Sequence, residues 1–196
     1  MLKSSVNNHI AIIMAGGQSN RMGINKALLK RGDKPLLEYV TQQIQATGIE
    51  SIYINSNVSL ETQLPIFIDA LPSFGPLSAI HSTFKALFTE HQNSHCLFVP
   101  VDMPLVSPTV LNELIDGLTS DVQVCHFKSH PLPCALKLEP LVLQQVERIL
   151  FHSDNYAVKH LFHHLSVNVL PVTNEHALTN TNTPQQWQQV IDNISG

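Results

Sequence analysis

Hydrophobic and polar positions along this chain form two alternating kinds of segment, short apolar runs and longer amphipathic stretches. A short apolar run bounded by glycine, proline or polar residues is typical of a buried strand. The amphipathic stretches repeat apolar residues at helical spacing, as Leu36, Val40 and Ile44 do. We therefore expect strands over residues 9–14, 51–55, 65–69, 96–101, 122–127, 133–138 and 166–171, and helices over residues 36–47, 76–87, 139–150, 156–164 and 183–194, with one more beginning at 107–108.

Glycine and proline mark the ends of several expected helices. Gly48 follows the first helix, where a residue without a side chain commonly ends a helix. Pro76 suits a first helical turn, because its missing N–H is not needed there. Ser107 is expected to cap the next helix, with Pro108 as its first residue.

Strands that alternate with helices at this spacing predict an α/β fold. We expect a single doubly wound, mostly parallel sheet with helices on both faces, a Rossmann-like arrangement. The strands expected at 122–127 and 133–138 follow each other closely, which allows for one antiparallel strand. No repeat, low-complexity tract or linker interrupts the pattern, so residues 1–196 are expected to form one domain.

The composition of the chain disfavours some kinds of binding partner. The formal net charge is −4 and charged residues make up 13% of the chain, which disfavours nucleic acid and anionic membranes as general partners. No apolar run approaches the roughly 20 residues that span a bilayer. The amino terminus lacks the apolar core of a signal peptide. We therefore expect a cytoplasmic protein.

Cysteine and histidine residues could mark disulfide or metal chemistry. The cysteines are isolated among apolar residues and lack C-x-x-C spacing, so we expect small buried hydrophobic residues at Cys96, Cys125 and Cys134. Several histidines lie at helical spacing without a matching carboxylate, and solvated or partly buried side chains are favoured over a metal site at His152, His160, His163 and His164.

A loop rich in glycine and in cationic residues follows the first strand. It contains Gly16, Gly17 and Gly23, together with Arg21 and then Lys26. Glycine lets the backbone approach a ligand closely and present its N–H groups. Arginine and lysine supply positive charge to phosphate oxygens. The loop therefore predicts binding of a nucleoside triphosphate.

Other glycine-rich loops fit this segment less well. A Walker A loop places lysine directly after its last glycine, whereas Lys26 follows Gly23 two positions late. A dinucleotide fingerprint needs G-x-G-x-x-G spacing, which Gly16-Gly17 lacks. An ordinary strand-to-helix turn with surface cations is the remaining alternative, and it leaves the coincidence of these residues unexplained.

Polar residues also follow three further expected strands. Asn55, Asp69 and Asp102 lie at their carboxyl ends, where open α/β sheets bind ligands. Such residues also commonly cap turns and helices, so each alone is ambiguous. We expect all of them to share one sheet edge with the glycine loop.

The string A-G-G-x-S-x-R-M-G-x-x-K-A-L-L over residues 15–29 resembles the nucleotidyltransferases related to molybdenum cofactor guanylyltransferase. Members usually carry Asp before the lysine, where this chain has Asn25. Relatives that use CTP, and several sugar-nucleotide enzymes, typically have A-A-G where this chain has Ala15-Gly16-Gly17. The double glycine therefore favours guanine over cytosine by resemblance.

The resemblance extends along the chain and implies a function. It implies transfer of GMP from GTP to the phosphate of molybdopterin with release of pyrophosphate, and Mg²⁺ held by Asp102 within Pro100–Pro104. Matching segments also lie at Gly75-Pro76-Leu77, His130-Pro131 and residues 180–184, the last on the pterin side. The implied nucleotide-binding residues are Met14, Ala15, Gly16, Gly17, Lys26, Asn55, Asp69 and Asp102, and the catalytic residues are Arg21, Lys26 and Asp102.

This chemistry needs charge neutralisation more than proton transfer. A phosphate nucleophile is already ionised at neutral pH, so no general base is assigned, and positioning with electrostatics carries catalysis. The resemblance implies GTP and molybdopterin as substrates, and we expect a monomer with handover contacts to other molybdenum cofactor proteins. The alternatives are another nucleotide or phosphorylated acceptor on the same fold, or a GTP-binding protein with weak turnover.

Overall fold

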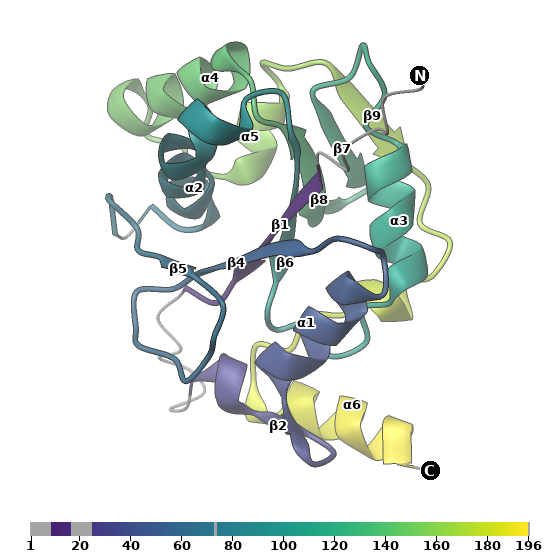
Figure 1. Cartoon of the computed structure of the whole chain (residues 1–196). Helices are drawn as coiled ribbons and strands as arrows, with labels where there is room; N and C mark the ends of the chain where they lie inside the picture. The colour runs from purple at the N-terminus through teal and green to yellow at the C-terminus, as the bar shows by residue number, and fades with distance from the viewer. Residues whose placement is uncertain (1–8, 17–24, 73, 196) are drawn as a thin grey trace, which may run out of the picture.

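The computed structural model describes residues 9–16, 25–72 and 74–195 and is built on a seven-stranded sheet (Figure 1). The strand order is β5-β4-β1-β6-β8-β7-β9. Strand β8 runs antiparallel to both of its neighbours, β6 and β7, and the other strand pairs are parallel. The bounds are β1 His9–Met14, β4 Ser51–Asn55, β5 Ile66–Phe67, β6 His95–Pro100, β7 Val124–Phe127, β8 His130–Lys137 and β9 Val167–Leu170. The predicted mostly parallel sheet, with one antiparallel strand, is confirmed.

Helices cover both faces of this sheet. In Figure 1, α2, α4 and α5 lie together on one side, and α1 and α3 lie on the other. The terminal helix α6 joins the second group, because Trp187 packs against the core on that side. The bounds are α1 Leu36–Gln45, α2 Pro76–His91, α3 Pro108–Asp116, α4 Pro140–His152, α5 Val158–Phe162 and α6 Pro184–Ser195.

The alternation of side chains along β1 divides the core into two layers. Ala11 and Ile13 belong to the cluster under α1 and α3, whereas Ile12 and Met14 belong to the cluster under α2, α4 and α5. Successive side chains of a strand point to opposite faces, so a strand covered on both faces is apolar throughout. This explains the continuous apolar run that predicted β1, and it packs the end of the strand between two core layers.

Short elements account for the main differences from the predicted pattern. Strand β5 is two residues long rather than 65–69. The 3₁₀ helices η1 (Lys26–Leu28) and η2 (His176–Leu178) and the hairpin of β2 (Lys30–Arg31) and β3 (Lys34–Pro35) were not predicted. Elements of two or three residues are too short to show a periodicity. Ser107 does precede α3, but its side chain makes no capping hydrogen bond.

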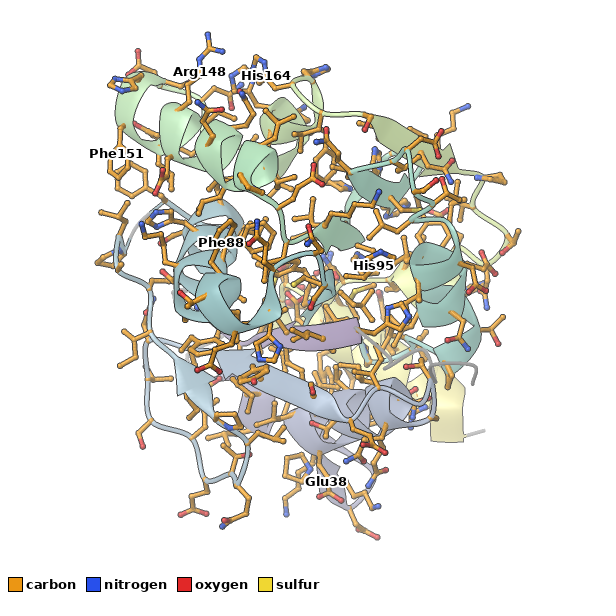
Figure 2. The ribbon with its side chains drawn as sticks, turned by 45° about the horizontal axis from the view of Figure 1, so that its top comes forward. Glu38, Phe88, His95, Arg148, Phe151 and His164 are labelled. Atoms are coloured by element: carbon orange, nitrogen blue, oxygen red, sulfur yellow. The ribbon has the colours of Figure 1, made fainter. Side chains whose placement is uncertain are left out.

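The cysteine and histidine side chains have the burial that was expected from the sequence. All three cysteines are free and buried, and burial raises the pKa of Cys125 to about 11, so its thiol stays neutral. His163 and His164 are exposed and His160 is partly buried. In Figure 2, His164 and Arg148 of α4 are both at the top of the view, whereas Glu38 of α1 is at the bottom. Among the described residues, no helix has the length and apolar content to cross a membrane.

Candidate functional site

The carboxyl ends of β1, β4, β5 and β6 meet at one edge of the sheet, because these neighbouring strands are parallel. Backbone hydrogen bonds continue just past the strands. The N–H of Ala15 donates to the carbonyl of Asn55 at 2.8 Å, and the N–H of Val101 donates to the carbonyl of Met14 at 3.1 Å. The prediction that the strand-end residues share one edge is confirmed, and their backbones are fixed relative to one another.

Asp69 is held beyond the short strand β5 by two asparagines. Asn55, which is 1% exposed, donates from Nδ2 to Asp69 Oδ1 at 2.9 Å. Asn57 donates from Nδ2 to Asp69 Oδ2 at 2.8 Å and accepts from the N–H of Asp69 at 2.9 Å. Each carboxylate oxygen of Asp69 therefore accepts a hydrogen bond from an amide group. We call Asn55, Asn57 and Asp69 the Asp69 cluster.

Gly16 lies directly beside this cluster. A Cβ atom added at Gly16 would stand 3.3 Å from Asn55 Oδ1 and 3.8 Å from Asp69 Oδ2. Even an alanine would therefore crowd the amide oxygen of Asn55. The glycine leaves an open, polar surface at the end of β1 to which a ligand can come close.

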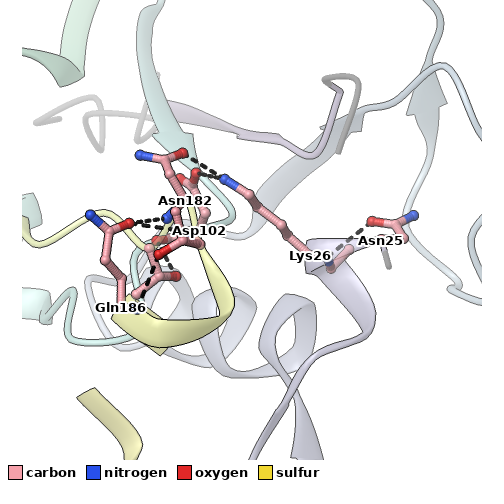
Figure 3. A network of polar contacts seen from close by, with 8 residues as sticks. Asn25, Lys26, Asp102, Asn182 and Gln186 are labelled. Carbon is pink, nitrogen blue, oxygen red and sulfur yellow. Dashed lines mark hydrogen bonds and ion pairs between the residues drawn. The ribbon is translucent and has the colours of Figure 1, made fainter. Parts of the chain in front are cut away.

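Lys26 and Asp102 form an ion pair at the end of β6 (Figure 3). The Lys26 ammonium donates to Asp102 Oδ2 at 2.7 Å and to Asn182 Oδ1 at 2.7 Å. The Lys26 and Asp102 side chains are only 17% and 16% exposed, so the pair is partly shielded from water. Charge-assisted hydrogen bonds in such surroundings are stronger than those of an exposed pair. We call Lys26, Asp102 and Asn182 the Asp102 cluster.

Local structure delivers Lys26 to this position. Lys26 begins η1, and Asn25 caps that short helix by accepting a hydrogen bond from the N–H of Ala27 at 3.0 Å. The side chain of Ala27 is fully buried, which anchors the turn in the core. Asn25, which stands where the resembling family usually has aspartate, therefore has a structural role as the cap of η1.

Replacing Asn25 with aspartate should leave turnover unchanged or raise it. A carboxylate can accept the same hydrogen bond from Ala27, and it adds a negative charge beside the Lys26 backbone. Steady-state rates of Asn25→Asp and the parent protein provide the measurement. Asn25→Ala is the companion variant, and it should lose activity because it removes the cap. A large loss in Asn25→Asp would contradict this account of η1.

A carboxyl-terminal segment completes the Asp102 cluster. The buried Thr181 donates from its N–H and from Oγ1 to the carbonyl of Asp102, at 3.0 and 3.3 Å. This contact places the next residue, Asn182, against Lys26. The expected pterin-side segment thus lies at the same sheet edge as the end of β6.

The structure describes only some of the remaining predicted site residues. Gly17 and Arg21 lie outside the described residues. The side chains of Met14 and Ala15 are buried in the two core layers, and their strand-end backbone groups bond to neighbouring strands. Their contribution to nucleotide binding stays a prediction.

Some contacts at this edge were not predicted from the sequence. His130, at the start of the antiparallel strand β8, contacts Glu175 with 3.0 Å between Nε2 and Oε1. Asn57 had no distinguishing pattern beyond its proximity to Asn55. The contact between Gln186 and Thr183 could have been predicted, because Thr183-x-x-Gln186 matches the capping box that begins many helices.

The Asp102 cluster fits a divalent cation shared with phosphate oxygens better than a metal centre made by protein alone. No group of three or more potential metal-ligating histidine, cysteine or acidic side chains occurs among the residues that the structure describes. Magnesium is usually held by one or two carboxylates, water and substrate phosphates. Within the described part of the chain, no hydrogen bond reaches Oδ1 of Asp102, which leaves this oxygen for a cation.

Comparisons with known proteins agree with this architecture. Residues 11–177 match the family described as a MobA-like NTP transferase domain. The molybdenum cofactor guanylyltransferase of Xanthomonas euvesicatoria pv. vesicatoria is 30% identical over 183 residues, or 92% of this chain and 93% of that protein.

Solved structures share the fold. Molybdopterin-guanine dinucleotide biosynthesis protein A from Archaeoglobus fulgidus has a TM-score of 0.77 at 20% identity, and the match covers 95% of this chain and 98% of that one. A Mycobacterium tuberculosis H37Rv protein in complex with manganese has a TM-score of 0.65 at 17% identity, over 94% of this chain and 98% of that one. The expected α/β fold is confirmed.

Proposed function

Because this chain belongs to the MobA-like NTP transferase family, we propose that it transfers GMP from GTP to the phosphate of molybdopterin and releases pyrophosphate. Family membership confirms the resemblance inferred from residues 15–29 and makes the protein a nucleotidyltransferase. The name of the similar Xanthomonas protein, molybdenum cofactor guanylyltransferase, supports this choice of nucleotide and acceptor.

The observation that carries the proposal is the partly shielded pair of Lys26 and Asp102 at the carboxyl edge of the sheet. An oxygen of the acceptor phosphate attacks the α-phosphorus of GTP while the bond to the bridging oxygen of pyrophosphate breaks. Both reactants are anions, so their repulsion must be reduced before the oxygens approach. Lys26 supplies a positive charge that stabilises the negative charge of the triphosphate.

Asp102 is the proposed ligand of a divalent metal, Mg²⁺. When bound, such an ion neutralises phosphate charge and orients phosphate oxygens. The manganese complex of the structurally similar Mycobacterium tuberculosis protein supports a divalent ion in this fold. Lys26 already bridges Asp102 and Asn182, so its ammonium can turn from Asp102 to phosphate when the carboxylate binds a cation. Arg21 is the second proposed catalytic cation.

The Asp69 cluster and the backbone at Gly16 are the proposed binding surface for the rest of the nucleotide. Asn55 and Asp69 lie on the β4 and β5 side of β1, whereas Asp102 lies on the β6 side. A nucleotide that extends across the end of β1 can therefore reach both clusters. The proposed acceptor side is the segment of residues 180–184, whose Asn182 side chain accepts a hydrogen bond from Lys26 at 2.7 Å.

GTP should bind at least tenfold more tightly than CTP, a difference of about 1.4 kcal/mol. The reason is the open surface at Gly16, which leaves room for a purine or a close backbone contact beside Asn55. Calorimetric titration with each nucleotide in the presence of Mg²⁺ measures the ratio. Gly16→Ala is the companion variant, and it should weaken GTP binding because its Cβ crowds the Asn55 amide oxygen. Equal or tighter CTP binding to the parent protein would point to a cytidylyltransferase instead.

The reaction itself is tested by pyrophosphate release. We expect release from GTP only when Mg²⁺ and molybdopterin are both present, and little release from ATP, CTP or UTP. Release that needs GTP but a different phosphorylated acceptor would keep the chemistry and change the substrate. GTP binding without release under any of these conditions would support a binding protein.

A further inference from the structure

The terminal helix α6 begins with a reciprocal set of hydrogen bonds. Gln186 donates from its backbone N–H to Oγ1 of Thr183 at 3.2 Å. The side-chain oxygen Oε1 of Gln186 accepts from the N–H of Thr183 at 3.1 Å and from the N–H of Asn182 at 2.8 Å. This is a capping box, in which the side chain of the third helical residue bonds back to the backbone N–H of the residue that precedes the helix. Here it also reaches one residue further back, to Asn182.

The additional bond links the helix to the Asp102 cluster. The backbone of Asn182 is held by Gln186 on its helix side and by the contact of Thr181 with the Asp102 carbonyl on the other side. From this fixed backbone the Asn182 side chain accepts the hydrogen bond of Lys26 at 2.7 Å (Figure 3). Lys26 is therefore oriented by two acceptors, of which one depends on α6.

We propose that Gln186 is a positioning residue for the transfer reaction, which sets the orientation of Lys26 through Asn182. The inference rests on the proposed function for its consequence in turnover, whereas the structural linkage stands independently of it. Gln186 is exposed and adds nothing to the buried core. Its contribution is the pair of bonds to the backbone of Asn182 and Thr183, and a displaced lysine slows transfer because catalysis here depends on geometry.

A substitution of Gln186 could also slow the reaction by destabilising helix α6. The choice of variants separates this explanation from the positioning of Lys26. Gln186→Ala removes the side-chain acceptor, whereas Gln186→Glu keeps it and suits the first turn of a helix. Gln188→Ala is the matched control, because Gln188 is a glutamine of the same helix whose side chain, among the described residues, hydrogen-bonds Asp192 at 2.7 Å and not the Asp102 cluster. Gln188→Ala should leave turnover unchanged.

Hydrogen exchange and Lys26 signals test the linkage without any turnover. Gln186→Ala should increase exchange at the amides of Asn182 and Thr183 and should shift the NMR signal of the Lys26 ammonium, assigned through its loss in Lys26→Ala. Gln186→Glu and Gln188→Ala should show neither change. An unshifted Lys26 signal in Gln186→Ala would overturn the proposal, even if the parent protein proved inactive with GTP and molybdopterin.

Kinetics test the consequence for the reaction. Gln186→Ala should lower the turnover number about tenfold, and Gln186→Glu should restore it. In an Asn182→Ala background the same change should have little further effect, because the two residues act in series. Full, independent losses from both substitutions, or normal turnover in Gln186→Ala, would show that Gln186 does not act through Asn182.

Discussion

Lys26→Ala should lower kcat/KM for GTP by a factor of about 100 or more, while the protein still folds. The Lys26 ammonium is the positive charge that lies at the carboxyl edge within 2.7 Å of both Asp102 and Asn182. Removing one preorganised hydrogen-bond donor that stabilises charge in the transition state commonly costs about 10²–10³ in rate. Steady-state pyrophosphate release and a thermal unfolding curve measure the two effects.

Lys30→Ala and Lys34→Ala are the controls for this prediction. Lys30 is exposed in the small hairpin, and Lys34 makes an exposed ion pair with Glu38 at 3.3 Å. Exposed pairs contribute little to stability, and neither lysine lies in the Asp102 cluster. Both variants should stay within about twofold of the parent rate, a change worth less than about 0.5 kcal/mol. Similar losses in all three variants would show that the loop does not bind phosphate through Lys26.

Asp102→Asn should reduce turnover by a factor of about 100 or more and should raise the Mg²⁺ concentration needed for half-maximal rate. The amide keeps the shape of the side chain but removes the negative charge that would hold the cation. The backbone carbonyl that binds Thr181 is unchanged, so the end of β6 should keep its structure. A magnesium titration of the rate, with a circular dichroism spectrum as a folding check, provides the measurement.

Asp121→Asn is the matched control for Asp102. Asp121 precedes β7 and lies at the amino edge of the sheet, where a hydrogen bond from Thr119 lowers the pKa of its carboxyl group. This substitution should leave both the turnover number and the magnesium dependence unaltered. Near-normal turnover of Asp102→Asn at limiting Mg²⁺ would refute the assignment of the metal ligand.

The larger elements of the fold could be predicted from the sequence because burial imposes a local pattern. Strand β1 is apolar from Ile10 to Met14 because helices cover both of its faces, and α1 shows apolar positions because one face packs on the sheet. The pairing of β6 with β8 depends on contacts between distant residues, so only the possibility of an antiparallel strand could be foreseen. Short elements such as η1 depend on single contacts, here the cap from Asn25.

The site was predictable in its residue types and less so in its contacts. Asp102 could be located because it directly follows a buried strand, and Lys26 because it follows a glycine-rich loop. Their ion pair joins positions 76 residues apart, and the bond from Lys26 to Asn182 joins positions 156 residues apart. No local pattern encodes such distances. Asn55 was predicted as a site residue, but its hydrogen bond to Asp69 and that of Asn57 became visible only once β4 and β5 had been placed side by side.

The fate of labelled GTP tests the proposed reaction most directly. The protein would be incubated with GTP labelled at the α-phosphate, Mg²⁺ and molybdopterin, and the products would be separated and weighed by mass spectrometry. The account predicts that the label appears in a guanine dinucleotide of molybdopterin, with one pyrophosphate released for each dinucleotide formed. Label that remains in GTP, or that appears only as free GMP or GDP, would contradict it.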